Sequence, residues 1–72
     1  ELPVEIKHIG ESKGYSIIRF IYKNDEYSAY IDNDQMSFKT GDKLIITIYH
    51  EIETDNYYNN GMSTHIKGFE YQ

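Results

Sequence analysis

Cysteine and tryptophan are absent from this 72-residue sequence, and proline occurs once, at Pro3. Without thiols the chain has no disulfide and no thiolate zinc site, so a small core must stabilise the fold by itself. The missing cysteine also fits a reducing compartment, and we therefore expect a cytoplasmic protein. The one proline lies near the N-terminus, where the edge of a sheet tolerates a residue without an N–H group.

Long apolar runs and basic charge are also scarce. No stretch approaches the roughly 20 apolar residues that a membrane helix needs, so we expect no membrane partner. The formal net charge is -5, which opposes tight binding to duplex phosphates. Four bases accompany three acids up to Lys23, whereas segments 24–34 and 44–66 contain acids but no lysine or arginine. We expect one end of the molecule to be nearly neutral or slightly basic and the rest to be acidic.

Tyrosine, isoleucine and threonine are frequent, and these residues favour half-buried strands. Apolar and polar residues alternate in five segments, and glycine and asparagine mark the turns between them. The expected strands are 3–9, 15–23, 27–32, 43–53 and 64–72. The hairpin turn between the second and third strands is expected at residues 24–26, from its Asn-Asp chemistry.

Five strands without a helix determine the expected fold class. A flat sheet would leave one apolar face in water, and curling the sheet into a barrel buries that face and removes most edges. The second and fourth strands have apolar residues on both faces, as expected where a strand bends between the two halves of a barrel. We predict an all-β fold with one domain over residues 1–72, a small five-stranded antiparallel barrel that is OB-like, with an SH3-like barrel as the alternative.

The segment KGYSII, residues 13–18, resembles the first ribonucleoprotein motif of cold-shock domains. The family's lysine, glycine, first aromatic residue and isoleucine are matched by Lys13, Gly14, Tyr15 and Ile18. Ser16 and Ile17 replace a glycine and the second aromatic residue of the motif.

The resemblance continues into the third strand. Tyr27 and Tyr30 fit the family's second motif, Ala29 stands where a histidine is expected, and His8 is the nearest counterpart of an exposed tryptophan. Residues 38–41, FKTG, resemble the connector before the fourth strand. Cold-shock domains are five-stranded OB-fold barrels that bind single-stranded RNA or DNA, so the resemblance implies that architecture and that ligand.

The residues themselves indicate the same kind of surface. Alternation places Tyr15 and Arg19 on one face of the second strand, and a tyrosine of the third strand is expected beside them. Bases stack on aromatic rings at roughly 1 to 3 kcal/mol each, and nearby cations hold the phosphates. The predicted nucleic-acid surface consists of Lys7, Lys13, Tyr15, Arg19, Tyr27 and Tyr30. The alternative role for each tyrosine is packing across strands with the hydroxyl in water.

A second candidate function rests on Tyr57 and Tyr58, which lie in a polar segment rich in asparagine. Tyrosine with asparagine is typical of adaptable protein-binding loops. The alternative function is therefore an acidic protein-interaction domain, acting as an inhibitor or as a subunit of an assembly. It would contact a protein partner through this loop or through a free strand edge.

Catalytic and metal motifs are not recognisable. His8, His50 and His65 have no metal-ligand spacing, and the segment 32–34 (DND) lacks the glycine and glutamate of a calcium loop. No nucleophile motif or phosphate-binding loop occurs. We expect no metal, no cofactor and no enzymatic activity.

Overall fold

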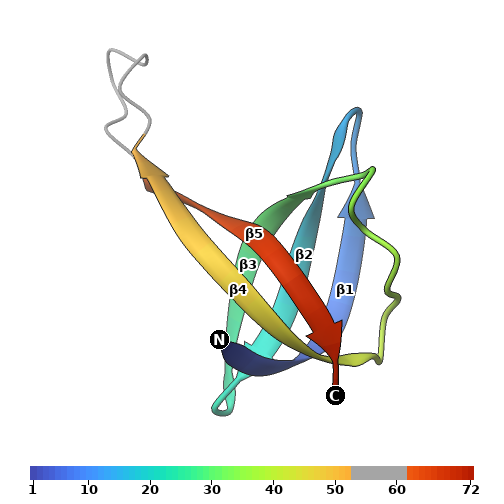
Figure 1. Cartoon of the computed structure of the whole chain (residues 1–72), viewed down its shortest axis with the longest axis vertical. Helices are drawn as coiled ribbons and strands as arrows, with labels where there is room; N and C mark the ends of the chain where they lie inside the picture. Colours follow the sequence, from blue (N-terminus) through green and yellow to red (C-terminus); the bar gives the residue numbers. More distant parts are fainter. Residues whose placement is uncertain (53–61) are drawn as a thin grey trace.

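A computed structural model describes residues 1–52 and 62–72 of the chain. These residues form five strands and no helix, which confirms the all-β class, and the strands close into a barrel (Figure 1). The strands are β1 (Leu2–Glu11), β2 (Tyr15–Tyr22), β3 (Asp25–Asp32), β4 (Lys43–Ile52) and β5 (Met62–Tyr71). Nothing in the described part of the chain is a helix of the length and apolarity that crossing a membrane requires.

The order of the strands around the barrel is β1-β2-β3-β5-β4, and β4 pairs back to β1. Four of the five pairings are antiparallel, but β3 and β5 are parallel, so the expected fully antiparallel barrel is wrong in this one pairing. A closed ring with an odd number of strands cannot alternate direction at every pairing. The observed order is consistent with an OB-like architecture.

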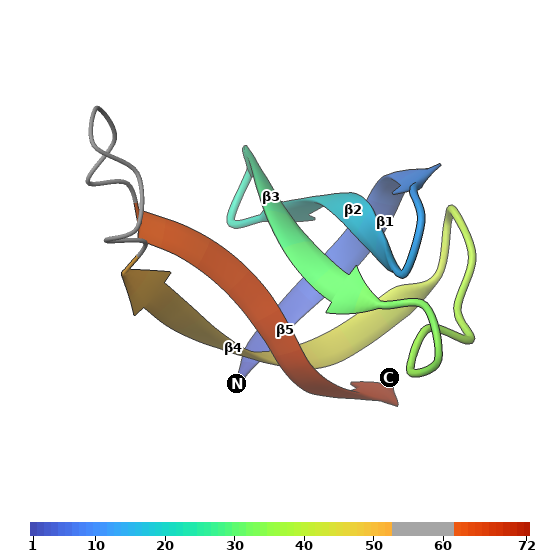
Figure 2. The same ribbon diagram turned by 90° about the horizontal axis from the view of Figure 1, so that it is seen from above.

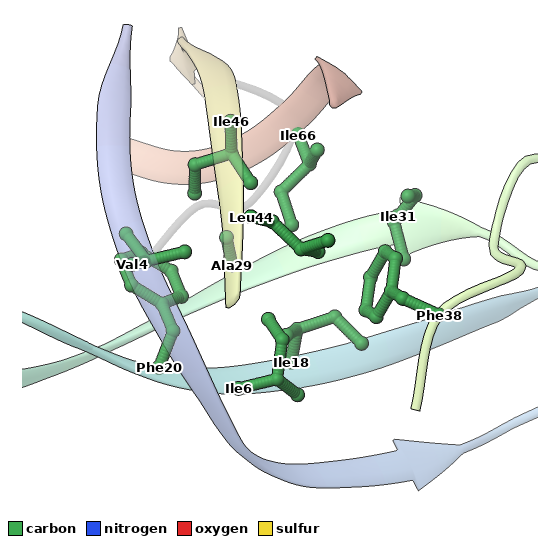
Figure 3. Close-up of a cluster of buried hydrophobic side chains, with 10 residues drawn as sticks. All are labelled: Val4, Ile6, Ile18, Phe20, Ala29, Ile31, Phe38, Leu44, Ile46 and Ile66. Atoms are coloured by element: carbon green, nitrogen blue, oxygen red, sulfur yellow. The ribbon is translucent and has the colours of Figure 1, made fainter. Parts of the chain in front are cut away.

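The interior of the barrel is filled by apolar side chains from every strand (Figure 3). Burial alternates along β2 as the sequence predicts, because successive side chains of a strand point to opposite faces. Phe38 comes from the connection between β3 and β4, and its ring packs edge-to-face on Phe69 of β5. The buried apolar residues are Val4, Ile6, Ile18, Phe20, Ala29, Ile31, Phe38, Leu44, Ile46 and Ile66.

The turn between β2 and β3 begins one residue earlier and ends two residues earlier than the sequence predicts. Lys23 and Asn24 both have positive φ, 50° and 70°, and they connect the paired residues Tyr22 and Asp25. Two central residues with positive φ define a type I′ hairpin, whose twist matches that of the flanking strands. β3 therefore begins at Asp25 rather than after residue 26.

β1 belongs to both halves of the barrel. It pairs with β4 over Leu2 to Glu5 and with β2 from Glu5 onward, and its register shifts between Ile6 and His8. Lys7 is the extra residue of this β-bulge, and bulges bend a strand and increase its twist. The bulge lies just after the point where β1 stops pairing with β4 and continues to pair with β2.

The two sides of β2 provide a test of the barrel. Ile18 is 0% exposed in the core, whereas its neighbour Ile17 is 38% exposed on the outer face. We expect Ile18→Ala to lower the free energy of unfolding by about 2–5 kcal/mol, because it leaves a cavity. Ile17→Ala should lower it by no more than about 1 kcal/mol. Urea denaturation followed by tyrosine fluorescence measures both, and equal losses would contradict the assignment of inner and outer faces.

Candidate functional site

Four aromatic rings from four neighbouring strands form a continuous row on the outer surface of the barrel. The ring centroid of Tyr15 (β2) is 5.6 Å from that of Tyr30 (β3), which is 5.5 Å from that of His65 (β5). The row ends at Tyr49 of β4, whose centroid is 5.1 Å from that of His65. We call these four residues the aromatic row.

The strand register produces this row. Tyr30 and His65 are the paired residues of the parallel β3–β5 contact, and His65 is also directly opposite Tyr49 in the antiparallel β4–β5 pair. Tyr15 is a diagonal neighbour of Tyr30, since Tyr30 itself pairs with Ile17. Directly opposite and diagonal side chains on one face of a sheet are within reach of aromatic rings.

The two ends of the row are more accessible than its middle. Tyr15 and Tyr49 are 40% and 43% exposed, whereas Tyr30 and His65 are half-buried between them. The rings of Tyr49 and His65 are nearly parallel, with an interplanar angle of 16°, and Tyr15 meets Tyr30 at 65°. The row therefore has a fixed centre and two exposed rings at its ends.

Two open hollows border the Tyr30–His65 pair. One has a volume of about 370 Å³ and extends to Tyr15. The other has a volume of about 170 Å³ and extends to Tyr49 and Lys67. Each hollow therefore lies beside one exposed tyrosine of the row, and each has room for part of a bound molecule.

The orientation of His65 is held by two contacts. Its Nε2 atom is 2.9 Å from the hydroxyl oxygen of Ser63 and 3.2 Å from a carboxylate oxygen of Glu51. Asp32 borders both hollows. Glu51 and Asp32 therefore place negative charge beside the aromatic row, which the sequence did not predict at this site.

The predicted cations Lys7 and Arg19 lie together, but beside the row rather than within it. They line a separate hollow of about 540 Å³, and Ile17 and Glu26 also form part of its walls. Because Ile17 pairs with Tyr30, this hollow adjoins the row on the outer face of the barrel. Glu26 of β3 partly offsets the two cations, since β3 pairs with β2.

The turn that contains Lys13 is held by a side-chain network. The hydroxyl of buried Ser16 donates to the Asn33 side-chain oxygen, and the Asn33 side-chain nitrogen donates to the Ser12 carbonyl at 2.9 Å. Gly14 has a φ of 87°, a left-handed conformation that glycine adopts without steric cost. The first half of the KGYSII segment is thus a fixed turn that holds Lys13, which is exposed, next to Tyr15.

The structure does not bring Tyr27 to the aromatic row. Tyr27 and Tyr30 are three positions apart on β3, so they point to opposite faces of the strand. Tyr27 pairs with Phe20, and their rings stack with centroids 6.1 Å apart. The alternation rule applied to β3 alone would have separated these two tyrosines.

Two members of the row were missed by the sequence analysis. Alternation places Tyr49 on the outward face of its strand, but only the order β3-β5-β4 brings Tyr49 and His65 beside Tyr30. Tyr57 and Tyr58, the predicted protein-binding residues, lie outside the described residues. Within residues 1–52 and 62–72, histidine, aspartate and glutamate form no group of three or more that would hold a metal ion.

Comparisons of the chain with protein-family models, with curated proteins and with solved structures found no significant match. The case for a functional site therefore rests on the geometry of the described residues.

Asn33 provides a test of the turn that positions Tyr15. We expect Asn33→Ala to lower the free energy of unfolding by about 1–3 kcal/mol, because it leaves the buried Ser16 hydroxyl without its partner. Asp34→Ala is the matched control, since Asp34 is an exposed neighbour. Thermal unfolding measures the effect, and identical melting temperatures for both variants would show that the network does not hold the turn.

Proposed function

We propose that this barrel is a non-enzymatic binding module for short single strands of RNA or DNA, which it binds by stacking bases on the aromatic row. The observation that carries the proposal is the aromatic row itself. Its four rings are continuous across β2, β3, β5 and β4, and the row is exposed at both ends. Every base has a flat π face, so such a surface accepts single strands with little sequence preference.

The two hollows beside the row define two base positions. One base stacks against Tyr15 in the larger hollow, and a second stacks against Tyr49 in the smaller one. The half-buried Tyr30–His65 pair separates them and is held by Ser63 and neighbouring strands. A duplex offers no unstacked base to these positions, so single strands are favoured.

Cations near the row supply contacts for phosphates. Lys13 adjoins Tyr15 in the turn before β2, and Lys67 borders the hollow of Tyr49. Arg19 and Lys7 extend the surface along the outer face of β1 and β2. The acids beside the row oppose phosphates, so we propose weak binding that falls as salt concentration rises.

Removing the end rings tests the stacking surface. We expect Tyr15→Ala and Tyr49→Ala each to lower the affinity for a ten-nucleotide oligothymidylate by about 5-fold to 150-fold, because each loses one stacked base. Fluorescence anisotropy at low salt measures the affinity. Tyr27→Ala is the matched control, because Tyr27 is at least as exposed as Tyr15 and Tyr49 but lies on the opposite face of β3 from Tyr30. Undetectable binding by the folded wild-type protein, or equal losses in all three variants, would rule out the proposal.

Charge removal beside the row should act in the opposite direction. We expect Asp32→Asn to raise oligothymidylate affinity by about 2-fold to 5-fold at low salt, because a negative charge no longer opposes the phosphates. Asp25→Asn changes the net charge equally at the other end of β3 and should have little effect. Lower affinity after Asp32→Asn would mean that the carboxylate itself binds the ligand, as it would bind a sugar hydroxyl, and would contradict the proposal.

A further inference from the structure

The pairing of β3 with β5, which closes the barrel, is short. Among the described residues these two strands pair only at Tyr30 with His65, and their first halves have no ladder contact with each other. In the described part of the chain, Asp25–Ser28 have ladder partners only in β2, and residues 62–64 only in β4. Both views show the β2–β3 hairpin and the far ends of β4 and β5 extending in different directions (Figures 1 and 2). We call the region between these first halves the β3–β5 gap.

An apolar hollow of about 270 Å³ opens into the β3–β5 gap. Its walls include Phe20, Tyr27 and Ile48, and Ser28 and Thr64 border it from the two strand edges. Tyr27 is on the inward-facing side of β3 with Ala29 and Ile31, yet it remains 48% exposed. The hollow explains this exposure, because it lies between the ring of Tyr27 and Thr64 of β5.

Two features of the β3–β5 gap match what an added strand requires. The edge of β3 presents backbone N–H and C=O groups that have no ladder partner among the described residues. The hollow beside that edge has mostly apolar walls. Main-chain hydrogen bonds to a sheet edge, together with a pocket for alternate side chains, are the elements of peptide binding by strand addition.

Charge at the rim indicates the kind of peptide. Asp25 and Glu26 are exposed at the start of β3, and the chain as a whole has a formal charge of -5. Lys23 has its Nζ atom 5.3 Å from the ring centroid of Tyr22, and Arg19 lines an outer hollow with Glu26. Neither cation is among the described residues that line the apolar hollow. A peptide with positive charge next to its apolar residue therefore complements this rim.

We propose that the β3–β5 gap binds an extended basic segment of a partner protein, which adds as a strand to the edge of β3 and places one aromatic side chain in the apolar hollow. This surface does not include the aromatic row, so it binds its partner independently of any nucleic acid.

A synthetic peptide provides the probe. It has seven residues with blocked termini, a central phenylalanine, lysine at each end and threonine between them. We expect saturable NMR shifts at the amides of Tyr27, Ser28 and Thr64, and slower hydrogen exchange at the amides of residues 25–28 that face the gap. Shifts centred on Tyr15 and His65 instead, or no saturable shifts, would overturn the proposal.

Three altered peptides test the mode of binding without changing the protein. Glycine for phenylalanine removes the side chain for the hollow, glutamate for lysine reverses the charge, and N-methylation of alternate amides removes ladder donors. Each change should weaken binding by at least about 5-fold, since each removes one source of affinity. Equal binding of the N-methylated peptide would exclude strand addition, and equal binding of the glutamate peptide would exclude the basic partner.

Protein variants separate this surface from the aromatic row. Tyr27→Ala should weaken peptide binding by at least about 5-fold and leave oligothymidylate binding unchanged. Tyr15→Ala should do the reverse. Melting temperatures confirm that both variants fold. If Tyr15→Ala weakened peptide binding as much as Tyr27→Ala, the β3–β5 gap would not be a separate binding site.

Discussion

The parallel pairing of β3 with β5 is the constraint on which both candidate surfaces depend. Five strands close into a ring only if at least one neighbouring pair runs in the same direction. In the part of the chain that the structure describes, that pair shares one paired position, Tyr30 with His65. On the outer surface this position joins the two middle rings of the aromatic row. Along the strands, the backbones separate before it and open the β3–β5 gap. One local pairing thus creates a stacked surface and, beside it, an edge of β3 that has no ladder partner among the described residues.

Burial of apolar side chains explains both why the barrel closes and why the pairing of β3 with β5 is short. Ile18 and Leu44 are fully buried from strands that are not adjacent, so closure removes their apolar area from water. On the inward face of β5, Ile66 belongs to this core, but two positions earlier the strand has Thr64. A threonine offers little apolar area against Tyr27. Extending the β3–β5 pairing toward Thr64 would therefore bury little apolar surface and add little to the free energy of folding.

Strand pairing also mixes charges that the sequence keeps apart. The first 23 residues contain most of the lysine and arginine residues near the site, whereas the charged residues of segment 24–34 are all acidic. Because β2 pairs with β3, Glu26 comes to lie in the same hollow as Arg19, and Asp32 pairs with Tyr15. The expected slightly basic end of the molecule is therefore not a separate face. The geometry of the rings, rather than electrostatic attraction, is the main support for the proposed site.

Local patterning predicted the all-β class, the five strands and the alternation along β2, because side-chain alternation is a local property that two neighbouring residues already define. The same rule places Tyr27 and Tyr30 on opposite faces of β3, and the predicted β2–β3 turn starts one residue late and ends two residues late. The partnership of Tyr30 with His65, and of His65 with Tyr49, was decided by the tertiary structure alone. These residues are distant in the chain, and no local pattern encodes which strands become neighbours. Closure of the barrel around its core decides that order, and with it the composition of the outer surface.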